Sequence, residues 1–131
     1  FIGGAIAPGL GISADALFSR AARLMRVDIR RPSKVIGTNT VEHLQIGLYY
    51  GYLGLIDGIL QRLLQELGME ARVIATGGLA NQLAQDSKYI SLVDDWLTLE
   101  GLLLVHQRNA ESKRVQRPRE HTRKSPNPQK T

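Results

Sequence analysis

The segment Arg72-Val-Ile-Ala-Thr76-Gly77-Gly78-Leu-Ala80-Asn-Gln-Leu-Ala84 predicts a strand, a glycine turn and the start of a helix in direct succession. Its first half is apolar and β-branched, and its second half repeats apolar residues at helical spacing. Such a turn brings backbone N–H groups to a helix N-terminus, where anions and nucleotides bind, and adjacent glycines let a ligand approach closely. The same residues also suit a tight turn without a ligand, so the rest of the chain has to decide.

The composition is that of one globular domain. The chain has 131 residues, 43% of them hydrophobic, and no cysteine, which excludes disulfides, thiolate metal sites and a cysteine nucleophile. No apolar run approaches the roughly 18 residues of a membrane span, and no cleavable signal precedes the first apolar segment. We therefore expect a soluble, cytoplasmic protein without a membrane partner. Because the chain begins at Phe1 inside an apolar run, we expect it to derive from a larger protein.

The net charge of +5 is concentrated at one end of the chain. Residues 111–131 contain seven basic and two acidic residues, whereas residues 1–110 contain ten of each. The end segment also holds three of the five prolines and no apolar periodicity, so we predict a disordered basic tail over 111–131. A solvated tail and a weak, salt-sensitive contact with nucleic acid both fit, and we do not expect nucleic acid as a main partner.

The first half of the chain predicts a strand and two helices. Residues 1–7 are predicted to form a buried strand, in which Gly3 and Gly4 mark either the close approach of a ligand or an edge bulge. Ser13 is the predicted N-cap of an amphipathic helix that ends near Met25, and an irregular connector covers residues 26–35. The longest helix is predicted from residues 36–40 to about Leu67.

Two features of this long helix concern function. Asn39 and Glu42 have the spacing of a capping box, which leaves Thr40 either as a ligand contact or as a capping residue. At about 100° per residue, one face carries a stripe of four glycines; these are Gly47, Gly51, Gly54 and Gly58. Such a stripe favours close packing within the subunit or across a homodimer, and we favour the homodimer, with Tyr49, Tyr50 and Tyr52 beside it.

The remaining elements are a helix to about Gln85, a strand over 89–93 and a helix over 97–106. The last helix is apolar nearly all round and is therefore predicted to be buried, with a close contact at Gly101. Asp94 and Asp95 suit either a cation or an acidic turn. The three histidines are isolated, and no Gly-Lys-Ser/Thr phosphate loop occurs, so the residues alone indicate no catalytic or metal centre.

Four ordered motifs resemble those of type III pantothenate kinases. They are Gly3-Gly4-Ala-Ile-Ala-Pro8-Gly9, Ile36-Gly37-Thr-Asn39-Thr40, Val73-Ile-Ala-Thr76-Gly77-Gly78-Leu79 and Leu97-Thr98-Leu99-Glu-Gly101-Leu102. The motif series ends at Asn109, and residues 1–110 resemble the C-terminal half of the family's chain. The resemblance implies an α/β fold, namely the C-terminal ribonuclease H-like lobe of the acetate and sugar kinase/Hsc70/actin superfamily. It also implies a homodimer that phosphorylates pantothenate with ATP in the first step of coenzyme A synthesis, with Mg and a monovalent cation (potassium or ammonium).

The resemblance also assigns roles to single residues. Thr40 matches a threonine that contacts pantothenate, and Thr76, Gly77 and Gly78 match the adenosine motif. Gly3 and Gly4 would line the nucleotide cleft. Thr38 stands where the family commonly has lysine, and Met25-Arg26 where many members have Leu-Pro.

The resemblance places no catalytic residue and no metal ligand in this chain. The family's catalytic aspartate and cation site belong to its N-terminal half, so we expect the chain alone to be inactive. The predicted organisation is a kinase lobe over 1–110 and a tail over 111–131. The rival hypotheses are a non-catalytic binding or regulatory relative that uses the tail, and a degenerate fragment that only dimerises.

Overall fold

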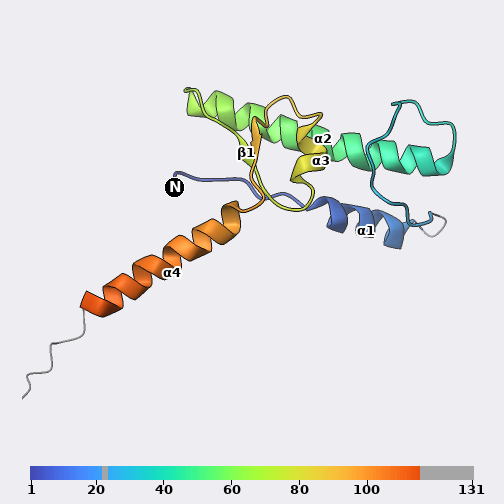
Figure 1. The fold of residues 1–131 in the computed structure, drawn as a ribbon. Coiled ribbons are helices and arrows are strands. Elements are labelled where there is room, and N and C mark those ends of the chain that lie inside the picture. Colours follow the sequence, from blue (N-terminus) through green and yellow to red (C-terminus); the bar gives the residue numbers. More distant parts are fainter. Residues whose placement is uncertain (22–23, 116–131) are drawn as a thin grey trace, which may run out of the picture. The chain divides into compact units, whose positions relative to one another are not determined.

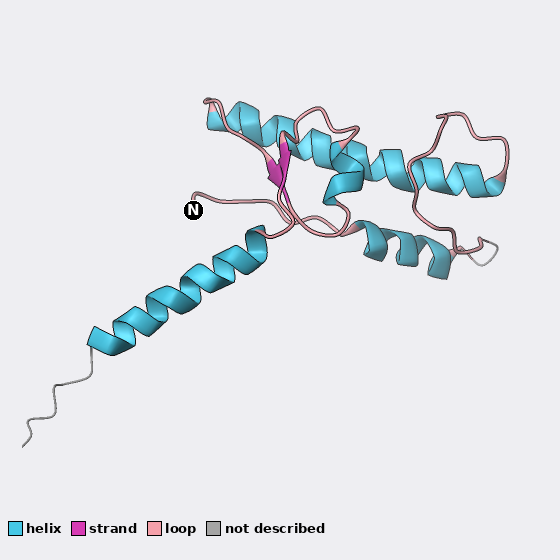
Figure 2. Cartoon of the chain, viewed as in Figure 1, coloured by secondary structure: helices cyan, strands magenta, loops and turns pink. Residues whose placement is uncertain are grey.

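The computed structural model describes residues 1–21 and 24–115, which divide into two units. The first unit ends at Asp95 and contains five elements: α1 (Leu10–Arg20), α2 (Thr40–Leu67), β1 (Ile74–Ala75), α3 (Ala80–Ala84) and β2 (Leu92–Val93). The second unit begins at Trp96 and contains α4 (Leu97–Val115). Figures 1 and 2 show these elements, which confirm a mixed helix and strand composition.

Helix α2 starts and ends as its sequence predicts. The Asn39 side chain accepts a hydrogen bond from the Glu42 N–H at 3.0 Å, which satisfies one free donor of the first turn. The Glu42 carboxylate accepts a hydrogen bond from the Thr38 N–H at 2.7 Å. In a standard capping box the donor would be the N–H of the cap residue Asn39, so here the reciprocal bond involves the residue before the cap. Gly68 ends the helix in the left-handed conformation, with φ of 61°.

The core of the first unit consists of two small clusters on α2. In one, Leu48 packs against Leu10 and Ala14 of α1. In the other, Tyr49 and Leu53 pack against Leu83 of α3. Both α1 and α3 are therefore held by neighbouring turns of the same long helix.

The strand, turn and helix predicted around Thr76–Gly78 are present in the expected order. Strand β1 pairs in parallel with β2, Ile74 opposite Leu92 and Ala75 opposite Val93, and α3 lies in the connection between them. Each strand has only two residues, shorter than predicted, because the parallel pairing is limited to Ile74 with Leu92 and Ala75 with Val93.

Two predictions for the N-terminal region are wrong. Residues 1–7 form no strand, and Phe1, Ile2 and Ile6 are exposed, since no described strand pairs with them. Helix α1 begins at Leu10 and not after Ser13; its N-cap is Gly9, whose carbonyl already accepts the Ser13 N–H at 2.9 Å. The helix ends at Arg20, five residues before Met25.

The burial predicted for the last helix does not occur within its own unit. The leucines of α4 are exposed, and a side chain at Gly101 would meet no atom within 4 Å, because the described part of this unit contains no second element to cover the helix. The helix continues to Val115, so the predicted tail boundary after residue 110 falls inside it. Residues 116–131 of the predicted tail lie outside the described residues.

The tyrosines expected beside the glycine stripe of the homodimer contact lie instead in and against the core. Tyr49 is fully buried in the core, and Tyr50 and Tyr52 are half-buried against it. Along the stripe, Gly47, Gly51 and Gly54 face open space within 4 Å, so the described chain gives them no close neighbour.

Candidate functional site

The Thr76–Gly78 turn lines a cavity of about 460 Å³ between α2 and α3. One wall is formed by Tyr52, Ile56 and Leu60 of α2. The opposite wall is formed by the turn itself with Ala80 and Leu83. The structure thus brings Thr76, Gly77 and Gly78 together at one edge of a largely apolar cavity, which is the usual composition of a small-molecule site.

The two glycines of the turn have different structural roles. Gly77 adopts φ of +99°, a conformation that residues with a Cβ rarely take, so the turn requires glycine there. Gly78 has no positive φ, and a Cβ built on it would meet no atom within 4 Å. Open space beside the Gly78 backbone is therefore available to a ligand. Helix α3 has only five residues, so its dipole would attract an anion weakly. The open space beside Gly78 is therefore the feature of this turn that best suits ligand binding.

Gly3 and Gly4 do not line the same cavity. They border a separate space of about 520 Å³, together with Leu63, Glu66 and Leu67 at the end of α2. The six predicted contact residues are therefore not gathered into one site by the described chain.

Thr40 lies apart from both cavities, at the start of α2. Its position is roughly 18 Å along the helix axis from Tyr52, since an α-helix rises about 1.5 Å per residue. The capping role belongs to Asn39, and Thr40 is exposed as the first residue of the helix. Of the two roles left open for Thr40, the structure removes capping.

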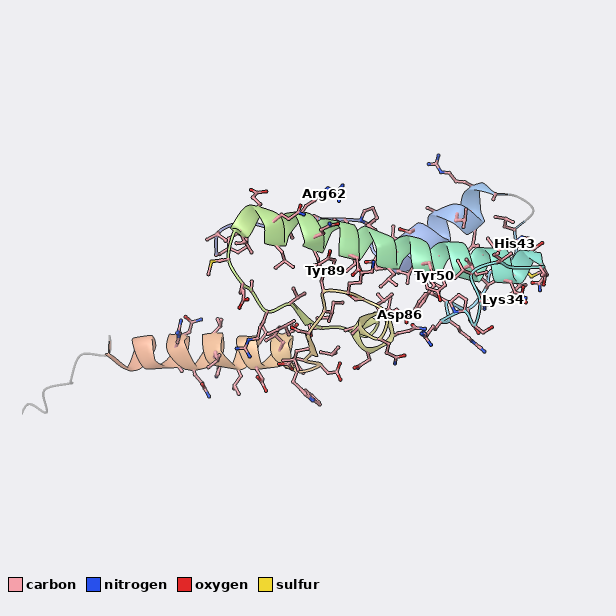
Figure 3. All side chains as sticks on the ribbon, turned by 90° about the horizontal axis from the view of Figure 1, so that it is seen from above. Lys34, His43, Tyr50, Arg62, Asp86 and Tyr89 are labelled. Carbon is pink, nitrogen blue, oxygen red and sulfur yellow. The ribbon has the colours of Figure 1, made fainter. Side chains whose placement is uncertain are left out.

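A positive charge adjoins Thr38, where the resemblance leads us to expect a lysine. The Lys34 Nζ lies 2.9 Å from the Glu42 carboxylate and 3.3 Å from the Thr38 hydroxyl oxygen. The hydrogen bond from Lys34, followed by that from the Thr38 N–H, lowers the pKa of Glu42 to about 2. Lys34 is labelled in Figure 3, near the N-terminus of α2.

Sequence reasoning missed a polar cluster that joins three segments. Arg31 donates two hydrogen bonds to the Asp86 carboxylate, at 2.7 and 2.6 Å, and the Tyr49 hydroxyl lies 2.8 Å from the same carboxylate. Arg31 and then Tyr49 hold the pKa of Asp86 below its ordinary value, while burial and then Asp86 raise the pKa of Tyr49 to about 12. Arg31 and Asp86 are 55 residues apart, in segments without apolar periodicity. No local sequence pattern therefore predicts that they form an ion pair.

The comparisons with known proteins agree on one family. The sequence model of the type III pantothenate kinase family matches residues 1–62. A type III pantothenate kinase of Acidobacterium capsulatum is 64% identical over 107 residues, which are 82% of this chain and 39% of that protein. One of Koribacter versatilis is 57% identical over 121 residues, or 92% and 43%. One of Bacillus cytotoxicus is 50% identical over 110 residues, or 84% and 42%.

The chain belongs to the type III pantothenate kinase family. This confirms the resemblance drawn from the four sequence motifs. The chain spans about two fifths of the length of the curated relatives it matches, with 39% of the Acidobacterium capsulatum protein and 43% of the Koribacter versatilis protein.

The described part of this family member contains no group of three or more His, Cys, Asp or Glu side chains that could hold a metal ion. Of the acidic pair considered for a cation, Asp95 instead accepts hydrogen bonds from the Asn81 amide at 3.2 and 3.3 Å. Over residues 1–21 and 24–115, no helix combines the length and hydropathy needed to cross a bilayer.

Proposed function

We propose that this chain is the C-terminal, nucleotide-side part of a type III pantothenate kinase, which transfers a phosphoryl group from ATP to pantothenate in the first step of coenzyme A biosynthesis. The observation that carries the proposal is the cavity of about 460 Å³ at the Thr76–Gly78 turn, in a chain 64% identical to a type III pantothenate kinase over 107 residues. We place the end of the kinase lobe at the end of α4, at Val115, with the remaining basic residues after it, and we place the protein in the cytoplasm.

In this proposal the cavity holds the adenosine of ATP. The apolar side chains of Ile56, Leu60 and Leu83 offer a surface for a flat base, and the Thr76 hydroxyl offers a polar contact at the edge. The open backbone at Gly77 and Gly78 lets the nucleotide lie against the turn. The parallel β1–α3–β2 arrangement supports the finer assignment to the ribonuclease H-like lobe of the acetate and sugar kinase/Hsc70/actin superfamily.

The other predicted contacts require more than this cavity. We propose Thr40 as a pantothenate contact, because it is exposed and is not the helix cap. We keep Gly3 and Gly4 as cleft residues that would act together with the part of the relatives' length that this chain does not cover. Neither assignment follows from the cavity at Thr76–Gly78.

We propose a homodimer formed through Gly47, Gly51, Gly54 and Gly58. The open space at the first three of these positions supports a partner that approaches the α2 backbone closely. At these three positions the described chain provides no close neighbour, so the alternative of a contact within the subunit has no support.

Chemistry is not assigned to this chain. The cavity lining contains no carboxylate or histidine that could serve as a base, and the described residues contain no fitting metal site. We therefore expect Mg and the potassium or ammonium ion to be held elsewhere in the complete enzyme. We also expect the 131-residue chain alone to be inactive. The alternative of a non-catalytic relative that uses the basic tail stays a prediction, since residues 116–131 lie outside the described part.

The test is a joined protein in which this chain replaces the matching region of the Acidobacterium capsulatum kinase. We expect pantothenate-dependent release of ADP from ATP by the joined protein and none by the chain alone. Gly78→Val should raise the KM for ATP about tenfold or more, because the added side chain fills space that the ligand needs. Gly11→Val is the matched control, since Gly11 also has open surroundings but lies outside the cavity. No pantothenate-dependent ADP release by the joined protein, beside an active parent kinase, would refute the proposal.

A further inference from the structure

We propose that Arg31, Asp86 and Tyr49 form a clamp that fixes the separation of the two cavity walls, so that Arg31 is a positioning residue for the nucleotide. The inference rests on the proposed function only for the identity of the ligand. Arg31 lies in the connector between α1 and α2, outside the four sequence motifs and more than forty residues before the Thr76–Gly78 turn.

The clamp is a compact set of hydrogen bonds around one carboxylate. The Arg31 Nε and a terminal nitrogen donate to the two oxygens of Asp86, and the Tyr49 hydroxyl lies 2.8 Å from the oxygen that Nε contacts. Bidentate pairs of this kind fix orientation as well as distance. The Asp86 side chain is only 15% exposed although Arg31 is 56% exposed, so the carboxylate is sheltered and depends on these partners.

The clamp connects the two cavity walls. Tyr49 precedes Tyr52 by about one helical turn, and Tyr52 begins the α2 wall. Asp86 follows α3 by two residues, and α3 supplies Leu83 to the other wall. Because Tyr49 and Leu83 also pack in one buried cluster, the bond between Tyr49 and Asp86 joins the walls directly beside the cavity.

A second tie holds the next residues to α2 two turns further along. The Ser87 hydroxyl donates to Asp57 at 2.6 Å, and the Lys88 N–H donates to the same carboxylate at 3.1 Å. Asp57 adjoins Ile56 of the α2 wall. The segment after α3 is thus fixed to α2 at two points, of which only the Asp86 point depends on a residue from the connector.

Loss of Arg31 should move one wall relative to the other. Without its two donors, the Asp86 carboxylate keeps only the Tyr49 hydroxyl and gains by turning toward water, which draws the end of α3 away from α2. Binding sites tolerate shifts of only about 0.5 Å in their contacts. We therefore expect weaker nucleotide binding and not a general loss of catalysis.

The experiment measures steady-state kinetics in the joined kinase described above. Arg31→Ala should raise the KM for ATP about five- to tenfold, with kcat and the KM for pantothenate within about twofold of the unsubstituted protein. Arg31→Lys, which keeps the charge but not the fork, should recover part of the loss. Arg30→Ala is the matched control. The neighbouring Arg30 pairs with Asp28 inside the same connector, and because the side chains of Arg30 and Asp28 are exposed, their pair does not join the cavity walls.

If Arg31→Ala and Arg30→Ala give the same KM for ATP, the clamp does not position the nucleotide. If Arg31→Ala fails to fold, the KM for ATP of Arg31→Lys and of Asp86→Asn is compared with that of Arg30→Ala instead.

An unsubstituted joined protein that phosphorylates no pantothenate would overturn the proposed function instead. The clamp is then decided on the 131-residue chain by amide hydrogen exchange over residues 77–84. Faster exchange in Arg31→Ala than in Arg30→Ala supports the clamp, and equal exchange overturns it.

Discussion

Replacing Tyr49 by phenylalanine removes one hydroxyl from the centre of the core and leaves the ring in place. The Tyr49 side chain is 0% exposed, and its hydroxyl oxygen lies 2.8 Å from the Asp86 carboxylate and 2.9 Å from the carbonyl of Gln82. A hydroxyl has one proton, so it donates to one of these acceptors at a time. The substitution therefore deletes one buried hydrogen bond without creating a large cavity.

The expected loss follows from what remains after the substitution. A hydrogen bond to a charged group contributes about 1.5–3 kcal/mol, and loss of the buried Tyr49 donor should fall near the middle of that range, about 2 kcal/mol. For a unit of this size that corresponds to a fall in Tm of roughly 10 °C. Tyr50→Phe is the matched control: its hydroxyl oxygen lies 3.5 Å from the Pro32 carbonyl, too far for a strong bond, so its loss should stay below about 0.5 kcal/mol.

The assay is urea unfolding of the 131-residue chain, followed by far-UV circular dichroism. The pH dependence adds an independent readout. Because the pKa of Tyr49 is raised from 10.0 to about 12, the unfolded chain releases this proton first, and stability should fall as pH rises from 10.0 to about 12. Tyr49→Phe should lack that slope. Equal losses for Tyr49→Phe and Tyr50→Phe would refute the reasoning.

Three further predictions concern α2. Thr40→Ala should raise the KM for pantothenate in the joined kinase with little change in stability, whereas Asn39→Ala should cost about 1 kcal/mol of unfolding free energy, because Asn39 is the cap; equal effects on KM would contradict the assignment. Gly54→Leu should lower the molecular mass measured by light scattering from dimer to monomer while leaving the helix intact, since no atom of the chain lies within 4 Å of the added Cβ. Glu42→Gln should remove the acid-induced loss of stability expected between pH 4.5 and about 2, where the unfolded chain binds the proton that folded Glu42 still lacks; an unchanged acid unfolding profile would argue against it.

Local signals in the sequence predicted the elements that depend on neighbouring residues. The Asn39 cap is confirmed because its partner is three residues away. The turn at Thr76–Gly78 is confirmed because a glycine must supply the positive φ at Gly77. In both cases the deciding interaction lies within a few residues, and the sequence alone contains the information.

Interactions between distant segments were not predictable in the same way. The hydrogen bonds from Arg31 to Asp86 join residues 55 apart, and charge and spacing do not distinguish Arg31 from its neighbour Arg30. The identity of a partner for a charged loop residue is set by the packing of α1, α2 and α3, which only the folded chain reveals.

The pattern of apolar residues predicts which residues contact a neighbour, but it does not identify the neighbouring surface. The exposed leucines of α4, the exposed Phe1 and Ile2 and the open glycine stripe on α2 were all expected to contact a neighbour. A leucine loses roughly 1.5–3 kcal/mol of favourable transfer free energy when it stays in water, so a run of them is retained only where some surface covers it. This chain spans 39% and 43% of two relatives in its family. We propose that these faces contact the part of the relatives' length that this chain does not cover, or a second copy of the chain, which would explain why pattern and exposure disagree at these places and agree in the core around α2.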